Sequence, residues 1–421
     1  MAIDEALAVQ RLSAAPVPGP VVEVARRLQQ AGHAAVLVGG AVRDVLLGLP
    51  ANDWDLASSA TPQEVIGLFR RTIPTGMQHG TVTVMVRDGD QTHPVEITTF
   101  RGEGAYVDGR RPESVTFLRD LVEDLARRDF TVNAFAWDPI EQRFSDPFDG
   151  LADLQASVVR AVGVPLERFR EDGLRTMRAV RFCATRGLSL EEQTAAAIPD
   201  ALDVLAKVSR ERVHVELTKL LASERPSAGL RPMWRTGIWP HALLPLPQDD
   251  DYESAIAAVD AMPRGPTPRL ARLLWPLAAA GCEHAGAIKA CIENLKPSKV
   301  ERAEVLALTG DGMRALAAAS EPEAIRRAVA TLTRAHLPAA LDLLAADDAR
   351  RVAIHAALQG AALSAGELAI KGRDLIADGV VKPGPGLGRC LAELLDAVLV
   401  DPAQNTRDEL LARARASEHA S

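Results

Sequence analysis

The stretch AVLVGGAVRDVLLGLPANDWDLAS, residues 35–58, holds the features that decide the fold. The apolar run at 34–38 predicts a short buried strand. This strand ends at Gly39-Gly40, and the next seven residues, 41–47, predict a helix that Gly48 stops. The stretch therefore predicts a strand, a tight glycine turn and a short helix.

Two acids follow in the triplet Asp53-Trp54-Asp55. Strand side chains alternate between faces, so the two carboxylates are expected on one face, about 6.6 Å apart along the backbone. Trp54 and Leu56 are then expected to point into the core. A carboxylate pair suits hard cations, and glycines before a helix let backbone amides approach phosphate. Neither a G-x-G-x-x-G fingerprint nor a Walker A loop is present in this stretch. The carboxylate pair together with the glycine turn predicts nucleotidyl transfer.

The spacing of GGAVRD, residues 39–44, and the D-x-D triplet resembles motif A of the polymerase-β-like nucleotidyltransferases. It is specifically similar to class II CCA-adding enzymes and bacterial poly(A) polymerases. The resemblance implies an α+β protein: a nucleotidyltransferase head with a small mixed sheet and helices, then an all-α neck, body and tail. It also implies that Asp53 and Asp55 hold two Mg²⁺ ions and that Gly40 and Arg43 grip the triphosphate.

Length and composition favour a globular protein with two to four domains, since 421 residues exceed one ordinary core. Apolar residues make up 47% and charged residues 25%, and no apolar run has the length of a membrane span, so no membrane partner is expected. The N-terminus lacks a secretory pattern, which predicts a cytoplasmic protein. The four cysteines are far apart, which argues against a zinc site or disulfides and predicts core positions.

The net charge of −8 at first speaks against an RNA partner. Charge is uneven, however: residues 160–186 carry seven arginines and three acids (Arg160, Arg168, Arg170, Arg175, Arg178, Arg181 and Arg186 against Glu167, Glu171 and Asp172). This segment predicts a local electropositive channel in an acidic protein.

Around motif A, helices are predicted at 21–30 and from Thr61 to about Arg71, and strands at 80–87 and 94–100. Glu96 lies on the second of these strands. If that strand lies beside the one carrying the D-x-D acids, Glu96 is a third catalytic acid; otherwise it is a solvent-facing strand residue.

The polar segment 101–123 is too long for a hairpin turn and predicts either a mobile active-site loop or a solvated linker. Its core, Tyr106 to Pro112, resembles the flexible loop of class II CCA-adding enzymes. The octet at 127–134, RRDFTVNA, resembles motif B of the same family. That resemblance implies that Arg128 binds the triphosphate and Asp129 the ribose hydroxyls.

Residues 146–163 resemble motif C, the connector between head and neck, with Asp149-Gly150 in place of the usual glycine pair. Beyond it the chain is Ala- and Leu-rich with helical periodicity. The predicted domains are a catalytic head at 1–150, a neck with the nucleotide-selecting helix at 151–222, a body at 223–310, and a tRNA-binding tail at 311–421.

Residues 171–182, EDGLRTMRAVRF, predict one helix with a polar stripe at every third residue, formed by Asp172, Arg175, Arg178 and Arg181. The stripe is either an ordinary salt-bridged face or, by resemblance to motif D, a nucleotide-binding template. In the template reading, the Asp172 acceptor beside the Arg175 donor matches cytosine and adenine and rejects uracil and guanine. Arg178 and Arg181 would then hold phosphates or stack on the base.

Two further segments resemble the family. Residues 210–221 resemble motif E, and their Arg212, Glu216 and Lys219 are interpreted first as helix-stabilising pairs within one helix. Near the end, the glycines at 384, 386 and 388 favour a turn between helices over a phosphate site.

The resemblance as a whole implies a template-independent enzyme that adds the 3'-terminal CCA of tRNA from CTP and ATP. A poly(A) polymerase, a partial CC-adding or A-adding enzyme, and a non-catalytic RNA-binding module stay open as alternatives. The sequence leaves the oligomeric state undetermined.

Overall fold

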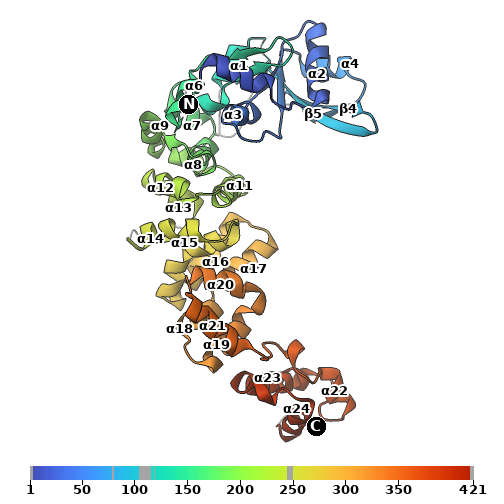
Figure 1. Ribbon diagram of the computed structural model, residues 1–421, viewed down its shortest axis with the longest axis vertical. Helices are drawn as coiled ribbons and strands as arrows, with labels where there is room; N and C mark the ends of the chain where they lie inside the picture. The colour runs from blue at the N-terminus through green and yellow to red at the C-terminus, as the bar shows by residue number, and fades with distance from the viewer. Residues whose placement is uncertain (1–2, 78–79, 104–114, 118, 244–249, 418–421) are drawn as a thin grey trace. The chain divides into compact units, whose positions relative to one another are not determined.

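The computed structural model describes residues 3–77, 80–103, 115–117, 119–243 and 250–417. The chain forms two compact units, Met1–Leu243 and Leu244–Ser421. Mixed sheet and helices make up the first unit, and helices make up the second (Figure 1). The α+β class with a helical remainder is therefore confirmed.

A seven-stranded mixed sheet forms the frame of the first unit, in the order β3-β4-β5-β2-β1-β8-β9. Its strands are β1 (Ala35–Val38), β2 (Asp55–Ser58), β3 (Thr72–Gly76), β4 (Thr81–Asp88), β5 (Gln91–Thr99), β8 (Ala136–Asp138) and β9 (Arg143–Ser145). Two-stranded pairs add β6 (Arg101–Glu103) with β7 (Val115–Phe117), and β10 (Val158–Val159) with β11 (Ser189–Leu190).

The helices of this unit are, in chain order, α1 (Glu5–Ser13), α2 (Gly19–Gln30), α3 (Gly40–Leu46), α4 (Pro62–Leu68), α5 (Leu121–Ala126), α6 (Gly150–Ala156), α7 (Pro165–Glu171), α8 (Leu174–Arg186), α9 (Glu192–Ala197), α10 (Leu202–Leu205), α11 (Arg210–Leu221), α12 (Ser227–Arg235) and α13 (Trp239–Ala242).

Sheet register places Asp55 beside Glu96. β2 pairs in parallel with β5, with Leu56 opposite Ile97, so Asp55 comes next to Glu96 at the start of the paired region. Leu56 and Ile97 are buried at 0% and 1% exposure, whereas Asp55 and Glu96 alternate to the solvent-exposed side. The condition for Glu96 to lie near the motif A acids, namely that its strand lies beside β2, is therefore met.

Several predicted boundaries need correction. β2 begins only at Asp55, so Asp53 precedes the strand instead of sharing it, although Trp54 is buried as predicted. α4 begins at a capping box between Thr61 and Glu64, as a helix starting at Thr61-Pro62 requires, and ends at Leu68, three residues before the predicted end. The edge strand β3 and the strands β8 and β9 were not predicted; they are short, and their apolar alternation spans too few residues.

The predicted helix at 171–182 is wrong in one respect, because it is broken. α7 ends at Glu171, Asp172 is extended, and α8 starts at Leu174. Gly173 lies at the break, where a Cβ would come 2.5 Å from the Leu205 backbone nitrogen. Close packing against that backbone therefore requires glycine, and the tight break sets Asp172 apart from the helix that carries the arginines.

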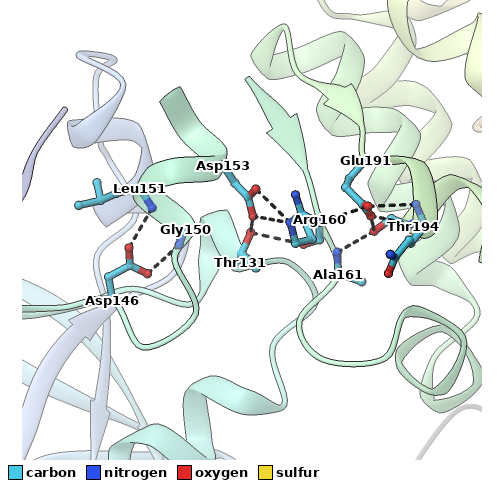
Figure 2. A network of polar contacts seen from close by, with 10 residues as sticks. Thr131, Asp146, Gly150, Leu151, Asp153, Arg160, Ala161, Glu191 and Thr194 are labelled. Atoms are coloured by element: carbon cyan, nitrogen blue, oxygen red, sulfur yellow. Dashed lines mark hydrogen bonds and ion pairs between the residues drawn. The ribbon is translucent and has the colours of Figure 1, made fainter. Parts of the chain in front are cut away.

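Motif C joins the sheet to the first neck helices through a polar network (Figure 2). Asp146 accepts hydrogen bonds from the Gly150 and Leu151 amides at the start of α6, at 2.8 and 2.9 Å. Asp153 on the same helix accepts from the Thr131 hydroxyl at 2.6 Å and pairs with Arg160 at 3.1 Å. Arg160 also pairs with Glu191 at 3.2 Å, which links the connector to the start of α9 (Figure 2).

In the described residues of the second unit, 250–417, helices are the only regular secondary structure. They are α14 (Asp250–Ala258), α15 (Pro266–Ala280), α16 (Ala285–Leu295), α17 (Lys299–Leu308), α18 (Asp311–Ala318), α19 (Pro322–Leu332), α20 (Leu337–Leu343), α21 (Asp348–Leu358), α22 (Gly372–Ala377), α23 (Pro385–Val400) and α24 (Arg407–Ala416). One of its cores packs α22, α23 and α24 around Leu375, Cys390 and Leu410. The predicted turn is present only at Gly384, which precedes α23; Gly386 and Gly388 lie inside that helix, so the prediction is wrong for these two glycines.

Within the described residues, no helix is both long and apolar enough to cross a membrane. Cysteine burial was predicted correctly for Cys183, Cys291 and Cys390, but Cys282 is exposed because it opens a short 3₁₀ turn after Gly281.

Candidate active site

The acids of motif A and β5 gather at one end of the sheet. Asp55 begins β2, Glu96 lies beside it on β5, and Asp53 lies two residues before β2. Partial burial raises the pKa of the Asp55 carboxyl, and so does the nearby Asp53 carboxylate; Arg128 lowers it, and Glu96 raises it again. Three carboxylates therefore act on one another at this end of the sheet.

Such mutual repulsion is what a bound divalent cation relieves, and oxygen donors are the ligands that Mg²⁺ prefers. No set of three or more His, Cys, Asp or Glu side chains is arranged to hold a metal ion in the described ranges. Two carboxylates suffice for Mg²⁺ when substrate phosphates and water complete its shell. The donor set at Asp53 and Asp55 therefore fits a divalent ion that is shared with a substrate.

The glycine turn brings the backbone close to this cluster. Gly39 has φ +76°, and a Cβ there would lie 3.3 Å from an Arg128 guanidinium nitrogen and 3.9 Å from an Asp55 carboxylate oxygen. Gly40 is the first residue of α3. Arg128 pairs with Asp124 at 3.3 Å, yet its buried Nε has no hydrogen-bond partner among the described residues. A partly exposed, incompletely bonded guanidinium beside the carboxylates is suited to bind an anion such as a triphosphate.

Arg43 is only 4% exposed, so it lies below the surface that a ligand would touch. Its guanidinium donates to Asp44 at 2.7 and 2.9 Å and to the Asn133 side chain. Arg186 of α8 donates twice to the same Asp44, both at 2.9 Å. Asp44 thus ties α3 to α8, and no sequence pattern predicts this contact between residues 142 positions apart.

Asp129 and Arg178 form the second link between head and neck. The Arg178 guanidinium reaches Asp129 at 2.6 Å, and the Asn133 amide donates to the same carboxylate at 2.9 Å. Burial alone would raise the pKa of Asp129, but Arg178 and the Asn133 hydrogen bond outweigh it and lower the pKa to about 2. Asp129 therefore stays ionised as a fixed acceptor in the site.

The two proposed members of the template point to different partners. Asp172 accepts from the Leu174 amide at 3.0 Å and pairs with Arg212 of α11 at 2.6 Å. The Arg175 guanidinium, 9% exposed, pairs with Glu171 and donates to the carbonyls of Arg168 and Arg127, each at 3.0 Å. The two side chains are each held in place by other residues and are not paired with one another.

Motif E has a different role from the predicted one. Arg212 and Glu216 do not pair within α11; Arg212 pairs with Asp172, and Glu216 pairs with Arg181 and, at 3.9 Å, with Arg178. Spacing within one helix cannot reveal such contacts between helices. α11 therefore holds α8 and the break between α7 and α8 through three ion pairs.

Phe182 packs against the arginine cluster, a role that the sequence does not predict. Its ring, 2% exposed, lies beneath three guanidinium groups, those of Arg181 at 4.1 Å, Arg43 at 4.9 Å and Arg178 at 5.6 Å. The ring face attracts cations and so stabilises this cluster of like charges. A Phe directly after an Arg at this helical spacing was the available signal.

The arginine-rich segment 160–186 is largely neutralised by carboxylates. Six of its seven arginines form ion pairs, with Asp153 and Glu191, Glu171, Asp129, Glu216 and Asp44 as the partners. The predicted excess of positive charge therefore does not amount to a free cationic surface. The expected loop core, Tyr106 to Pro112, lies outside the described residues.

Comparison with protein families assigns most of the first unit. Residues 35–160 match the poly A polymerase head domain, and residues 187–248 match a probable RNA and SrmB-binding site of polymerase A. Residues 332–414 match a putative tRNA nucleotidyltransferase domain 2.

Relatives match almost the whole chain. The CCA-adding enzyme of Lactiplantibacillus plantarum is 38% identical over 404 residues, covering 94% of this chain and 95% of its own. The CCA-adding enzyme of Latilactobacillus sakei is 39% identical over 416 residues, covering 95% and 98%. Among solved structures, the Bacillus stearothermophilus CCA-adding enzyme in complex with CTP superposes with a TM-score of 0.72 at 32% identity, covering 94% and 97%. On this similarity in sequence and fold, the chain belongs to the family of CCA-adding enzymes.

Proposed function

We propose that this protein adds or repairs the 3'-terminal CCA of tRNA, using CTP and ATP and releasing pyrophosphate. The observation that carries the proposal is the full-length match to enzymes named for this reaction, 38% identical over 94% of the chain. The carboxylates of β2 and β5 beside Arg128 supply a site of the chemistry that such a transfer requires.

In the proposed reaction, the RNA 3'-oxygen forms a bond to the α-phosphate of the nucleotide while the bond to pyrophosphate breaks. Arg128 binds the triphosphate, and Gly39-Gly40 lets it approach the backbone. Arg43, being buried, acts by positioning Asn133 and Asp44. Asp129, held by Arg178 and Asn133, accepts hydrogen bonds from the ribose hydroxyls and so favours ribonucleotides.

Enzymes of this family generally use divalent metal ions. We propose Mg²⁺, held by Asp53 and Asp55 with Glu96 assisting; when bound, it would lower the pKa of the RNA 3'-hydroxyl and neutralise charge on pyrophosphate.

Base selection is proposed to reside at Asp172 and Arg175. Cytosine and adenine each present an amino donor beside a ring-nitrogen acceptor, whereas uracil and guanine present the reverse order. A fixed Asp acceptor and Arg donor match the first pair and leave buried groups unpaired against the second. Asp172 is already fixed by Arg212 and the Leu174 amide. To bind the base, Arg175 has to replace one of its present hydrogen bonds, such as the one to the Arg127 carbonyl, with a hydrogen bond to the base.

A tRNA trimmed of its last three nucleotides tests the proposal when CTP and ATP are supplied separately and then together. Complete CCA with both nucleotides, and CC with CTP alone, support it. A long A tail would indicate a poly(A) polymerase. With both nucleotides supplied, a halt at CC or the addition of A alone would indicate a partial enzyme. Absence of any incorporation alongside tight tRNA binding would indicate an RNA-binding module.

The cytoplasmic location and the four-domain division stay predictions.

A further inference from the structure

A cavity of the first unit lies at the end of α8 that is far from Asp172 and Arg175. It has a volume of about 870 Å³, and its walls come from the end of α8, the junction of α11 and α12, and Leu49 after α3. That volume is in the range of sites for nucleotide-sized ligands.

The charges lining this cavity are mostly positive. Arg181, Arg186, Lys219 and Arg225 face it, with Glu224 as the acid among its lining residues. Arg181 and Arg186 are already paired with Glu216 and Asp44. Lys219 and Arg225 are exposed, and neither side chain forms an ion pair with any residue in the described part of the chain. In a protein of net charge −8, two free cations at one cavity favour an anionic ligand.

A wall residue of the cavity is only a few positions from a catalytic carboxylate in the sequence, which limits the distance between them in space. Leu49, 43% exposed at its wall, is four residues before Asp53, so their Cα atoms lie at most about 14 Å apart. Stacked nucleotides rise about 3.4 Å each, so a few nucleotides of one strand cover that distance. Leu49, Leu188 and Ala184 also give the cavity an apolar side, against which bases and riboses can pack.

We infer that this cavity binds the single-stranded 3' end of the RNA acceptor, with Lys219 and Arg225 contacting phosphates upstream of the reacting 3'-hydroxyl. The inference rests on the proposed function and adds to it a place for the RNA strand next to the nucleotide site. The ligand is the backbone of the RNA, so contacts here hold the acceptor without reading its bases.

The test is a Lys219→Ala/Arg225→Ala double variant of the full chain, assayed with trimmed tRNA. We expect the KM for tRNA to rise roughly tenfold at moderate salt, and the slope of log affinity against log salt to fall by about 1.4 for two lost phosphate contacts. The KM values for CTP and ATP and the kcat at saturating tRNA should stay within about twofold of wild type.

Two controls separate charge from structure. A Lys219→Arg/Arg225→Lys variant keeps both charges and should retain wild-type tRNA binding. An Arg26→Ala/Lys207→Ala variant removes two exposed cations that do not line the cavity, and it should leave the tRNA KM and the salt slope unchanged.

An unchanged tRNA KM and salt slope in the Lys219→Ala/Arg225→Ala variant, with normal CCA addition, would overturn this inference and leave the proposed function intact. If the wild type adds no nucleotides, the proposed function fails; filter retention of tRNA by the same variants then still decides whether the cavity binds RNA.

Discussion

At the scale of single residues, the site depends on side chains that are fixed before substrate arrives. Asp129 is held by Arg178 and Asn133, Asp172 by Arg212, and Arg43 by Asp44. Preorganised dipoles and charges of this kind cost little reorganisation when the nucleotide binds. The sequence indicates candidates for the chemistry, but it could not predict the partners of these side chains, because Arg212 and Asp172 are 40 positions apart.

Asp129→Asn should weaken the fold in a pH-dependent way. The folded pKa of about 2 lies below the ordinary 3.8, so ionised Asp129 stabilises the fold above pH 3.8, and this contribution is lost as the pH falls through 2. We expect the variant to lose roughly 2 kcal/mol of unfolding free energy at pH 7 and about 1 kcal/mol at pH 3. Urea unfolding at both pH values measures this. Asp200→Asn, at an exposed carboxylate, is the control, and an equal loss in both variants would argue against the buried pair.

Asp172→Ala should relax base selection. Removal of the fixed acceptor takes away the contact that distinguishes the amino groups of cytosine and adenine from the carbonyls of uracil and guanine. The preference for CTP over UTP should fall by about 1 to 3 kcal/mol, measured as the ratio of kcat/KM values. Unchanged selectivity, with CTP incorporation retained, would place the template elsewhere.

At the scale of elements, the apolar strands and the amphipathic helices were predictable, and the breaks between them were not. The strands β4 and β5 and the helix α2 are within two or three residues of their predicted bounds. The break between α7 and α8 escaped prediction because it depends on the contact of Gly173 with the backbone at Leu205. Helical periodicity carries no information about such a contact.

The motif C turn allows an element-scale prediction with an internal control. Gly150 has no room for a Cβ, which would lie 2.5 Å from the Thr131 carbonyl oxygen and 2.6 Å from the Phe135 ring. Gly150→Ala should therefore cost about 1 to 3 kcal/mol of unfolding free energy, or more. Asp149 has φ +56°, which glycine adopts freely, so Asp149→Gly should stay within about 1 kcal/mol of wild type. Chemical denaturation compares the two, and a reversed order would contradict the close packing of this connector.

At the scale of the whole molecule, the family and the order of its parts were predictable because several motifs recur in one order from Ala35 to Leu221. The motifs end at Leu221, and similarity to relatives is what extends the assignment over 94% of the chain. The cavity at the end of α8 was not predicted, since its walls come from three segments between Leu49 and Ala228. Only folding brings those segments together.

The central claim is that the carboxylates at the start of β2 perform the transfer itself. Its most direct test compares wild type with Asp53→Ala in two measurements on the same trimmed tRNA: incorporation from CTP and ATP, and equilibrium binding of the tRNA. We predict that Asp53→Ala abolishes incorporation of both nucleotides while tRNA binding stays largely intact. Retained incorporation of either nucleotide would contradict the assignment of these acids to catalysis.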